Sequence, residues 1–166
     1  MDIIVNKTYS LWILNSERWI MKVLIIEDNP NKLKQIKNFL KEYYNQPQIE
    51  EARSFNGGKA KLYEETWDLI LLDMSLPTYD ITHTEYGGDK KPVAGKNLMK
   101  RMLNRKIFTP VVIITQFETF DDDRISLDSL NQEFNEKFSN IWKGTIFYGN
   151  DDWNIELKKL LDELDL

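Results

Sequence analysis

Apolar and polar residues alternate along this chain in blocks that predict a strand followed by a helix, five times over. Residues 23–26 are a continuous run of β-branched and leucine side chains, typical of a strand that is covered on both faces. Pro30 then begins a segment in which Leu33, Ile36 and Leu40 recur at helical spacing. The predicted strands are residues 23–26, 48–53, 67–72, 110–115 and 145–148, and the predicted helices are residues 30–44, 54–65, the segment around 98–103, 121–138 and 155–164.

This regular alternation indicates an α/β protein with a doubly wound, five-stranded parallel sheet. The 166 residues, of which 42% are apolar, are enough to bury one substantial core. In open parallel sheets, ligands bind beyond the carboxyl ends of the strands, where the strand order reverses. Polar residues at those strand ends are therefore the first candidates for a functional site.

Three of the predicted strands end on such residues. Glu27 and Asp28 follow the first strand, Asp73 follows the third, and Thr115 ends the fourth. Carboxylates held a few ångströms apart repel one another in a partly desolvated site, so they need a counter-charge. A divalent cation with oxygen ligands is the usual answer, and the pattern predicts an acidic metal pocket.

Composition narrows the range of partners. The formal net charge of −5 argues against a nucleic-acid-binding face, because phosphate contacts need clustered lysine and arginine. The chain has no cysteine, so disulfides and thiolate chemistry are excluded. No apolar run reaches transmembrane length, and Asp2 stands where a signal peptide would carry basic residues. We expect a cytoplasmic protein that does not interact with membranes.

The sequence disfavours two other functions of α/β proteins, phosphate hydrolysis by a haloacid dehalogenase-type phosphatase and nucleotide binding through a phosphate-binding loop. Phosphatases of the haloacid dehalogenase type need a second aspartate two residues after the nucleophile, where this chain has Ser75. Gly95-Lys96 lacks both the upstream glycine and the following serine or threonine of a phosphate-binding loop. The sequence therefore predicts a protein that is not an enzyme in the usual sense.

From Met21 onward the chain resembles a bacterial response-regulator receiver domain, the phosphoacceptor module of two-component signalling. The family has an acidic pair after its first strand, a phosphorylated aspartate with a proline four residues on after its third, and threonine or serine at the end of its fourth. Glu27-Asp28, Asp73 with Pro77, and Thr115 match these positions in order. The resemblance implies a flavodoxin-like fold with strand order 2-1-3-4-5.

The same resemblance implies a function. Asp73 would attack the phosphorus of a phosphohistidine or of a small phosphodonor, with Thr115 as a hydroxyl donor to the phosphoryl group. Mg²⁺ would be held by Glu27, Asp28, Asp73 and the backbone carbonyl of Ser75. The implied partner is a sensor histidine kinase or another signalling protein, and a homodimer stays open.

The chain departs from the family at the position of its lysine, which ends the fifth strand and pairs with the phosphoryl oxygen. Alignment on the last helix places Asn150 there, with Gly149 as the next candidate, and neither carries a charge. Gln116, where a small residue is usual, either crowds the site or supplies an amide donor. Four other lysines are candidates to replace the missing one, namely Lys90, Lys91, Lys96 and Lys143.

Two segments lie outside the resemblance. An insertion of about fourteen residues, at about 78–94, emerges beside the acidic pocket and contains His83, to which we assign no role. Residues 1–20 are an N-terminal extension, too apolar for a typical disordered tail, and residues 21–166 are the receiver-like domain. These departures leave a second function open, a pseudo-receiver that binds a partner without being phosphorylated.

Overall fold

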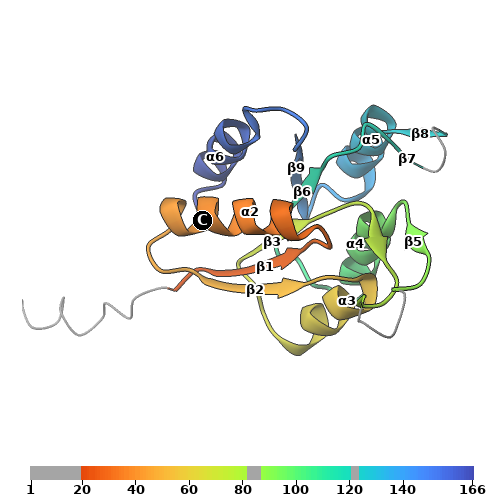
Figure 1. The fold of residues 1–166 in the computed structure, drawn as a ribbon, viewed down its shortest axis with the longest axis horizontal. Coiled ribbons are helices and arrows are strands. Elements are labelled where there is room, and N and C mark those ends of the chain that lie inside the picture. Colours follow the sequence, from red (N-terminus) through yellow and green to blue (C-terminus); the bar gives the residue numbers. More distant parts are fainter. Residues whose placement is uncertain (1–19, 82–86, 121–123) are drawn as a thin grey trace, which may run out of the picture.

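The computed structural model describes residues 20–81, 87–120 and 124–166, which fold around a parallel five-stranded sheet (Figure 1). Its strands lie in the order β2-β1-β3-β6-β9. This is the predicted order 2-1-3-4-5, with four short strands (β4, β5, β7 and β8) added to the numbering, so the predicted fold class is confirmed. The bounds are β1 Lys22–Ile26, β2 Gln48–Ala52, β3 Leu69–Leu72, β6 Val111–Thr115 and β9 Trp142–Phe147.

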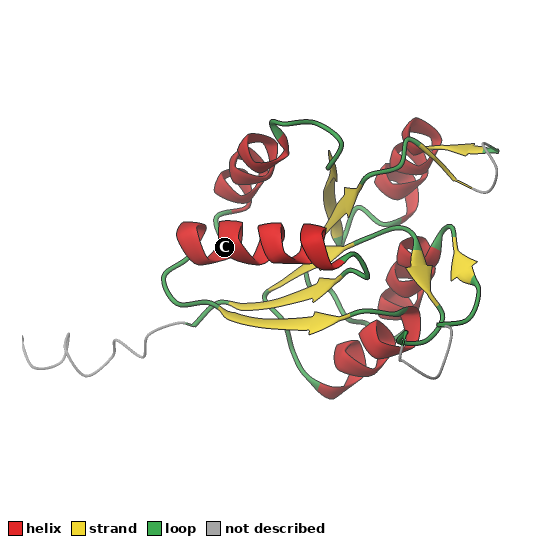
Figure 2. Cartoon of the chain, viewed as in Figure 1, coloured by secondary structure: helices red, strands yellow, loops and turns green. Residues whose placement is uncertain are grey.

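Helices cover both faces of the sheet (Figure 2). Two helices pack on one face and three on the other. Side chains alternate along each strand and point to opposite sides of the sheet, so the sheet contributes to two separate cores. On β1, for example, Val23 and Ile25 join one core, while Leu24 and Ile26 join the other. The first face carries α2 (Pro30–Tyr43) and α6 (Trp153–Leu164), and the second carries α3 (Phe55–Glu64), α4 (Ala94–Asn104) and α5 (Leu127–Lys137).

The helix predicted at residues 121–138 begins later than the pattern indicates. Thr119–Phe120 (β7) and Ile125–Ser126 (β8) pair as an antiparallel ladder, and α5 starts only at Leu127. The Ser126 hydroxyl accepts a hydrogen bond from the Ser129 N–H and so caps the helix. The strand Ile125–Ser126 therefore occupies residues that the pattern assigned to the helix, while residues 121–123 lie outside the described residues.

The segment after β3 also forms a hairpin. Leu76–Pro77 (β4) pairs in antiparallel fashion with Lys90–Lys91 (β5), and the Tyr79 N–H donates to the Gly87 carbonyl. Part of the predicted insertion is thus ordered against the carboxyl edge of the sheet. His83 and residues 1–19 lie outside the described residues, so the predicted domain limits stay a prediction.

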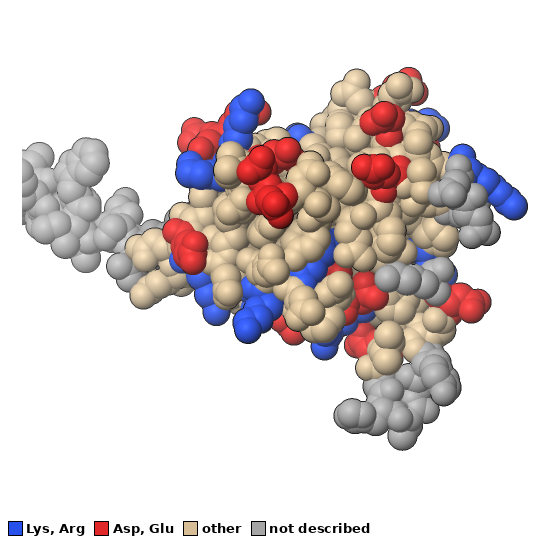
Figure 3. All heavy atoms as spheres, turned by 45° about the horizontal axis from the view of Figure 1, so that its top comes forward, with Lys and Arg blue, Asp and Glu red and all other residues tan. Residues whose placement is uncertain are grey.

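The surface carries mixed charge. On the face that Figure 3 shows, acidic and basic side chains are interspersed rather than gathered into one basic patch, in keeping with the net charge of −5. No helix in the described ranges has the length and apolar character needed to span a membrane.

Helix α4 lies so close to the end of β3 that only glycine fits at its second position. The Gly95 N–H donates to the Met74 carbonyl, and a Cβ atom at Gly95 would lie 2.7 Å from the Asp73 carbonyl oxygen. We expect Gly95→Ala to lower the free energy of unfolding by about 1–2 kcal/mol in urea denaturation, since overpacking outweighs the helix propensity of alanine. Lys100→Ala, at an exposed position of the same helix, should change it by less than about 0.5 kcal/mol. Equal stability of the two variants would contradict the close packing.

Candidate functional site

Two neighbouring strands deliver three carboxylates to one point at the carboxyl edge of the sheet. The Asp73 N–H donates to the Ile26 carbonyl at 2.9 Å, which fixes the residue after β3 against the end of β1. The Glu27 N–H donates in turn to the Ala52 carbonyl of β2. As a result, Glu27, Asp28 and Asp73 each offer an oxygen within 4.8 Å of the others. The structure thus brings the predicted acids together, and their role as metal ligands stays a prediction.

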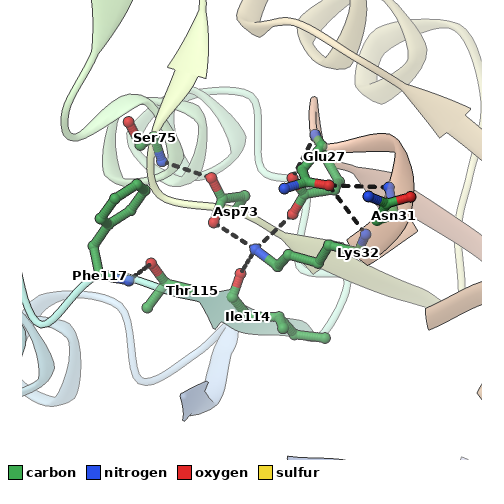
Figure 4. Close-up of polar contacts among 9 residues, drawn as sticks. Glu27, Asn31, Lys32, Asp73, Ser75, Ile114, Thr115 and Phe117 are labelled. Carbon is green, nitrogen blue, oxygen red and sulfur yellow. Dashed lines mark hydrogen bonds and ion pairs between the residues drawn. The ribbon is translucent and has the colours of Figure 1, made fainter. Parts of the chain in front are cut away.

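A lysine that the sequence analysis did not single out lies between two of these acids, Glu27 and Asp73 (Figure 4). The Lys32 ammonium is 2.6 Å from Glu27 Oε2 and 2.8 Å from Asp73 Oδ1. It also donates to the Ile114 carbonyl of β6 at 2.6 Å. Only 1% of the Lys32 side chain is exposed, so one ammonium satisfies three acceptors away from water.

The first turn of α2 places Lys32 in this position. Asn29 is the N-cap, and its side-chain oxygen accepts hydrogen bonds from the N–H groups of Asn31 and Lys32. Pro30 follows at the first helical position, where its missing N–H costs nothing. Lys32 then falls on the buried face of the helix, four residues before Ile36 and eight before Leu40. That spacing is the signal that could have identified Lys32, because a lysine in register with a core stripe must either turn outward or find buried partners.

Burial and pairing shift the pKa values in this cluster. Burial raises the pKa of the Glu27 carboxyl to about 7, and the nearby Asp73 adds to the rise, while the Lys32 ammonium opposes it. Burial alone would lower the pKa of Lys32, but Asp73 and Glu27 outweigh it and the pKa lies above its usual value. Lys32 is therefore a fixed positive charge at neutral pH.

Both oxygens of Asp73 have donors. Oδ1 accepts from the Lys32 ammonium, and Oδ2 accepts from the Ser75 N–H at 3.0 Å. Asp73 and Ser75 are buried, with 4% and 8% of their surfaces exposed. Two donors that approach from opposite sides hold the carboxylate in one orientation, toward the other acids.

The end of β6 supplies a hydroxyl to the same region. Thr115 is fully buried, and its Oγ1 accepts a hydrogen bond from the Phe117 N–H at 3.3 Å. Its own hydroxyl hydrogen can therefore point elsewhere. Gln116, which the sequence places next to the site, is exposed to solvent.

The end of β9, where the family's lysine is expected, contributes an aromatic ring. Gly149 and Asn150 are both exposed. Tyr148, the first residue after β9, donates its N–H to the Thr115 carbonyl at 2.7 Å. The centroid of its ring lies 5.6 Å from the Lys32 ammonium, within cation–π range.

Three of the four lysines proposed from the sequence have partners elsewhere, and the side chain of Lys90 lies outside the described part of the structure. The Lys96 ammonium pairs with Glu133 at 2.5 Å, and that of Lys91 lies over the ring of Phe55. Lys143 donates to backbone carbonyls of the turn before β9. Within the side chains that the structure describes, only Lys32 forms an ion pair with Asp73.

A hollow of about 270 Å³ opens beside Asp28. It is lined by Asp28, Arg53, Asp80 and Ile81. Asp80 and Ile81 follow β4, so the inserted hairpin forms one wall of the approach to Asp28.

Comparison with known proteins places this geometry in a family context. Residues 23–133 match the family described as the response regulator receiver domain. The Detocs response regulatory protein DtcB of Enterobacter cloacae is 31% identical over 150 residues, which cover 87% of this chain and 100% of that protein. An uncharacterised protein of Sinorhizobium fredii, y4jR, is 29% identical over 152 residues, covering 87% of this chain and 99% of that protein.

Solved structures share the fold. A CheY-like receiver domain protein from Methanospirillum hungatei has a TM-score of 0.60 at 19% identity, covering 88% of this chain and 94% of its own. The chemotaxis response regulator CheY4 of Vibrio cholerae has a TM-score of 0.55 at 18% identity, covering 88% of this chain and 97% of its own.

The cap that positions Lys32 can be tested on its own. Asn29→Ala removes the oxygen that accepts from the Asn31 and Lys32 N–H groups, and we expect the free energy of unfolding in urea to fall by about 1 kcal/mol. Asn29→Asp keeps the cap and should keep the stability. Asn38→Ala, at an exposed position inside the same helix, should cause no loss. A similar loss in the Asn38 and Asn29 alanine variants would contradict the role of the cap.

Proposed function

The chain belongs to the response-regulator receiver domain family of two-component signalling, and we propose on that premise that Asp73 is its phosphoacceptor and that Mg²⁺ supports the transfer. One observation carries the proposal. The Asp73 carboxylate is held by two donors at the carboxyl edge of the sheet, with oxygens of Glu27 and Asp28 within 4.8 Å. This arrangement orients a nucleophile and surrounds it with groups that can bind a cation.

The proposed reaction is a transfer of one phosphoryl group. An oxygen of Asp73 forms a bond to phosphorus, and the bond from phosphorus to the donor's nitrogen or oxygen breaks, with its electron pair leaving on the donor. The Ser75 N–H holds the carboxylate during the attack. The Thr115 hydroxyl, buried at the end of the adjoining strand, is free to donate to a phosphoryl oxygen.

The residues present fit a divalent metal ion. Mg²⁺ prefers carboxylate and carbonyl oxygens as ligands. Three carboxylates come from Glu27, Asp28 and Asp73, and the Ser75 carbonyl is a further candidate ligand. Their combined negative charge exceeds the single positive charge of Lys32. When bound, the ion neutralises charge on the transferred group.

The implied partner is a sensor histidine kinase or another signalling protein that carries the phosphoryl group. Such a donor would approach through the hollow beside Asp28, which is lined in part by Asp80 and Ile81 of the inserted segment. A pseudo-receiver that binds a partner without phosphorylation is the alternative, and it predicts no covalent change at Asp73.

Intact mass separates these two functions. We expect incubation with Mg²⁺ and acetyl phosphate to add the mass of one phosphoryl group, because Asp73 is the nucleophile. Asp73→Asn should show no gain, since the amide cannot attack phosphorus. Wild-type protein that gains no mass at millimolar donor would favour the pseudo-receiver.

Metal binding can be tested with a matched pair of aspartates. Asp28 belongs to the acid cluster, whereas Asp80 lies in the same hollow outside that cluster. We expect Mg²⁺ to raise the melting temperature of the wild type. Asp28→Asn should weaken Mg²⁺ affinity at least about tenfold in calorimetric titration, because it removes a charged oxygen ligand. Asp80→Asn should leave the affinity within about twofold, and equal losses in both variants would argue against a site centred on the acid cluster.

A further inference from the structure

Among the side chains that the structure describes, Lys32 supplies the only cation that forms an ion pair with Asp73. This lysine comes from helix α2 rather than from the end of a strand. Taking a charge out of water is unfavourable unless partners replace the lost hydration. Lys32 has three such partners within 2.8 Å. A buried lysine with this many acceptors is fixed in place, so its charge is directed at Asp73 and Glu27.

The end of β9 cannot supply that charge. Tyr148 stands at the first position after the strand, and the exposed Gly149 and Asn150 follow it. The Tyr148 ring and the Lys32 ammonium are neighbours, at 5.6 Å from centroid to nitrogen. The aromatic ring from the end of β9 and the cation from α2 are thus neighbours in the site.

We propose that Lys32 is the catalytic cation of this site, which binds a phosphoryl oxygen when Asp73 is phosphorylated. This assignment rests on the proposed function. Phosphorylation converts the Asp73 carboxylate into an acyl phosphate, whose negative charge lies on the phosphoryl oxygens. An ammonium that begins 2.8 Å from Asp73 Oδ1 needs only a small movement to follow that charge. Lys32 keeps its protons throughout, and only its hydrogen bond changes acceptor.

Its other contacts suit this role. The Ile114 carbonyl accepts from the ammonium at 2.6 Å and does not take part in the transfer, so it anchors the lysine before and after the reaction. Glu27 holds the same nitrogen from the β1 side. The charge is therefore in position before the donor arrives, which is the condition for effective electrostatic stabilisation of a transition state.

The test compares rates of phosphoryl gain from acetyl phosphate with Mg²⁺, followed by intact mass, in variants checked for folding by circular dichroism. We expect Lys32→Met to slow the gain by about 100-fold, the effect of removing one preorganised donor. Lys96→Met, which removes a partly buried lysine paired with Glu133, should keep the wild-type rate within about twofold.

A second substitution distinguishes charge from structure. In the double variant Lys32→Met with Tyr148→Lys, the cation returns at the end of β9, and we expect the rate to rise at least about tenfold above that of Lys32→Met alone. The double variant Lys32→Met with Tyr148→Phe restores no charge and should stay slow. A structural role of Lys32 alone would give both double variants the same rate.

A measurement on the wild type decides the matter if Lys32→Met does not fold or is not rescued. The ¹⁵N resonance of the Lys32 ammonium, identified by its loss in Lys32→Arg, should shift when beryllofluoride and Mg²⁺ are added. A resonance that stays unchanged while beryllofluoride binds overturns the assignment. So does a Lys32→Met variant that reacts at the wild-type rate. Failure of the wild type to gain a phosphoryl group instead overturns the proposed function, and the assignment with it.

Discussion

The buried ammonium of Lys32 is the constraint on which the carboxyl edge of this fold depends. It joins the first turn of α2 to Glu27 after β1, Asp73 after β3 and the Ile114 carbonyl of β6. Two carboxylates buried side by side would repel each other strongly without it. Four elements thus meet at one charge, and its contacts tie the first turn of α2 to the ends of three neighbouring strands.

The rest of the fold makes that meeting point rigid. The central strands β1, β3 and β6 are buried on both faces, and the two cores hold α2 and α6 on one side and α3, α4 and α5 on the other. The short strand pairs β4–β5 and β7–β8, which are not part of the five-stranded sheet, lie at its carboxyl edge (Figure 1). Loops at that edge can change without disturbing the cores, which is why new walls around a site arise there.

The position of Lys32 on α2 also determines which side chains surround its ammonium. Because Lys32 comes from α2, its charge lies beside Tyr148, whose ring is 5.4 Å from that of Trp153. Trp153 in turn packs against Phe39 of α2 at 5.9 Å. The acid cluster is therefore continuous with the aromatic contacts that join α2 to α6, the two helices on one face of the sheet.

The sequence by itself determined the fold class and the meeting of Glu27, Asp28 and Asp73, because strand periodicity and strand-end residues are local in the chain. The strand order followed from the resemblance to a family. The sequence missed the start of α5, since the pairing of β7 with β8 competes with helix propensity. It also missed Lys32. The spacing of Lys32 with Ile36 and Leu40 marks it as a candidate, but the ammonium and its partner Asp73 are 41 residues apart, so the local sequence does not decide whether the charge is buried or extends to solvent. Only the tertiary structure, which brings α2 against the ends of β1, β3 and β6, decides that the charge turns inward.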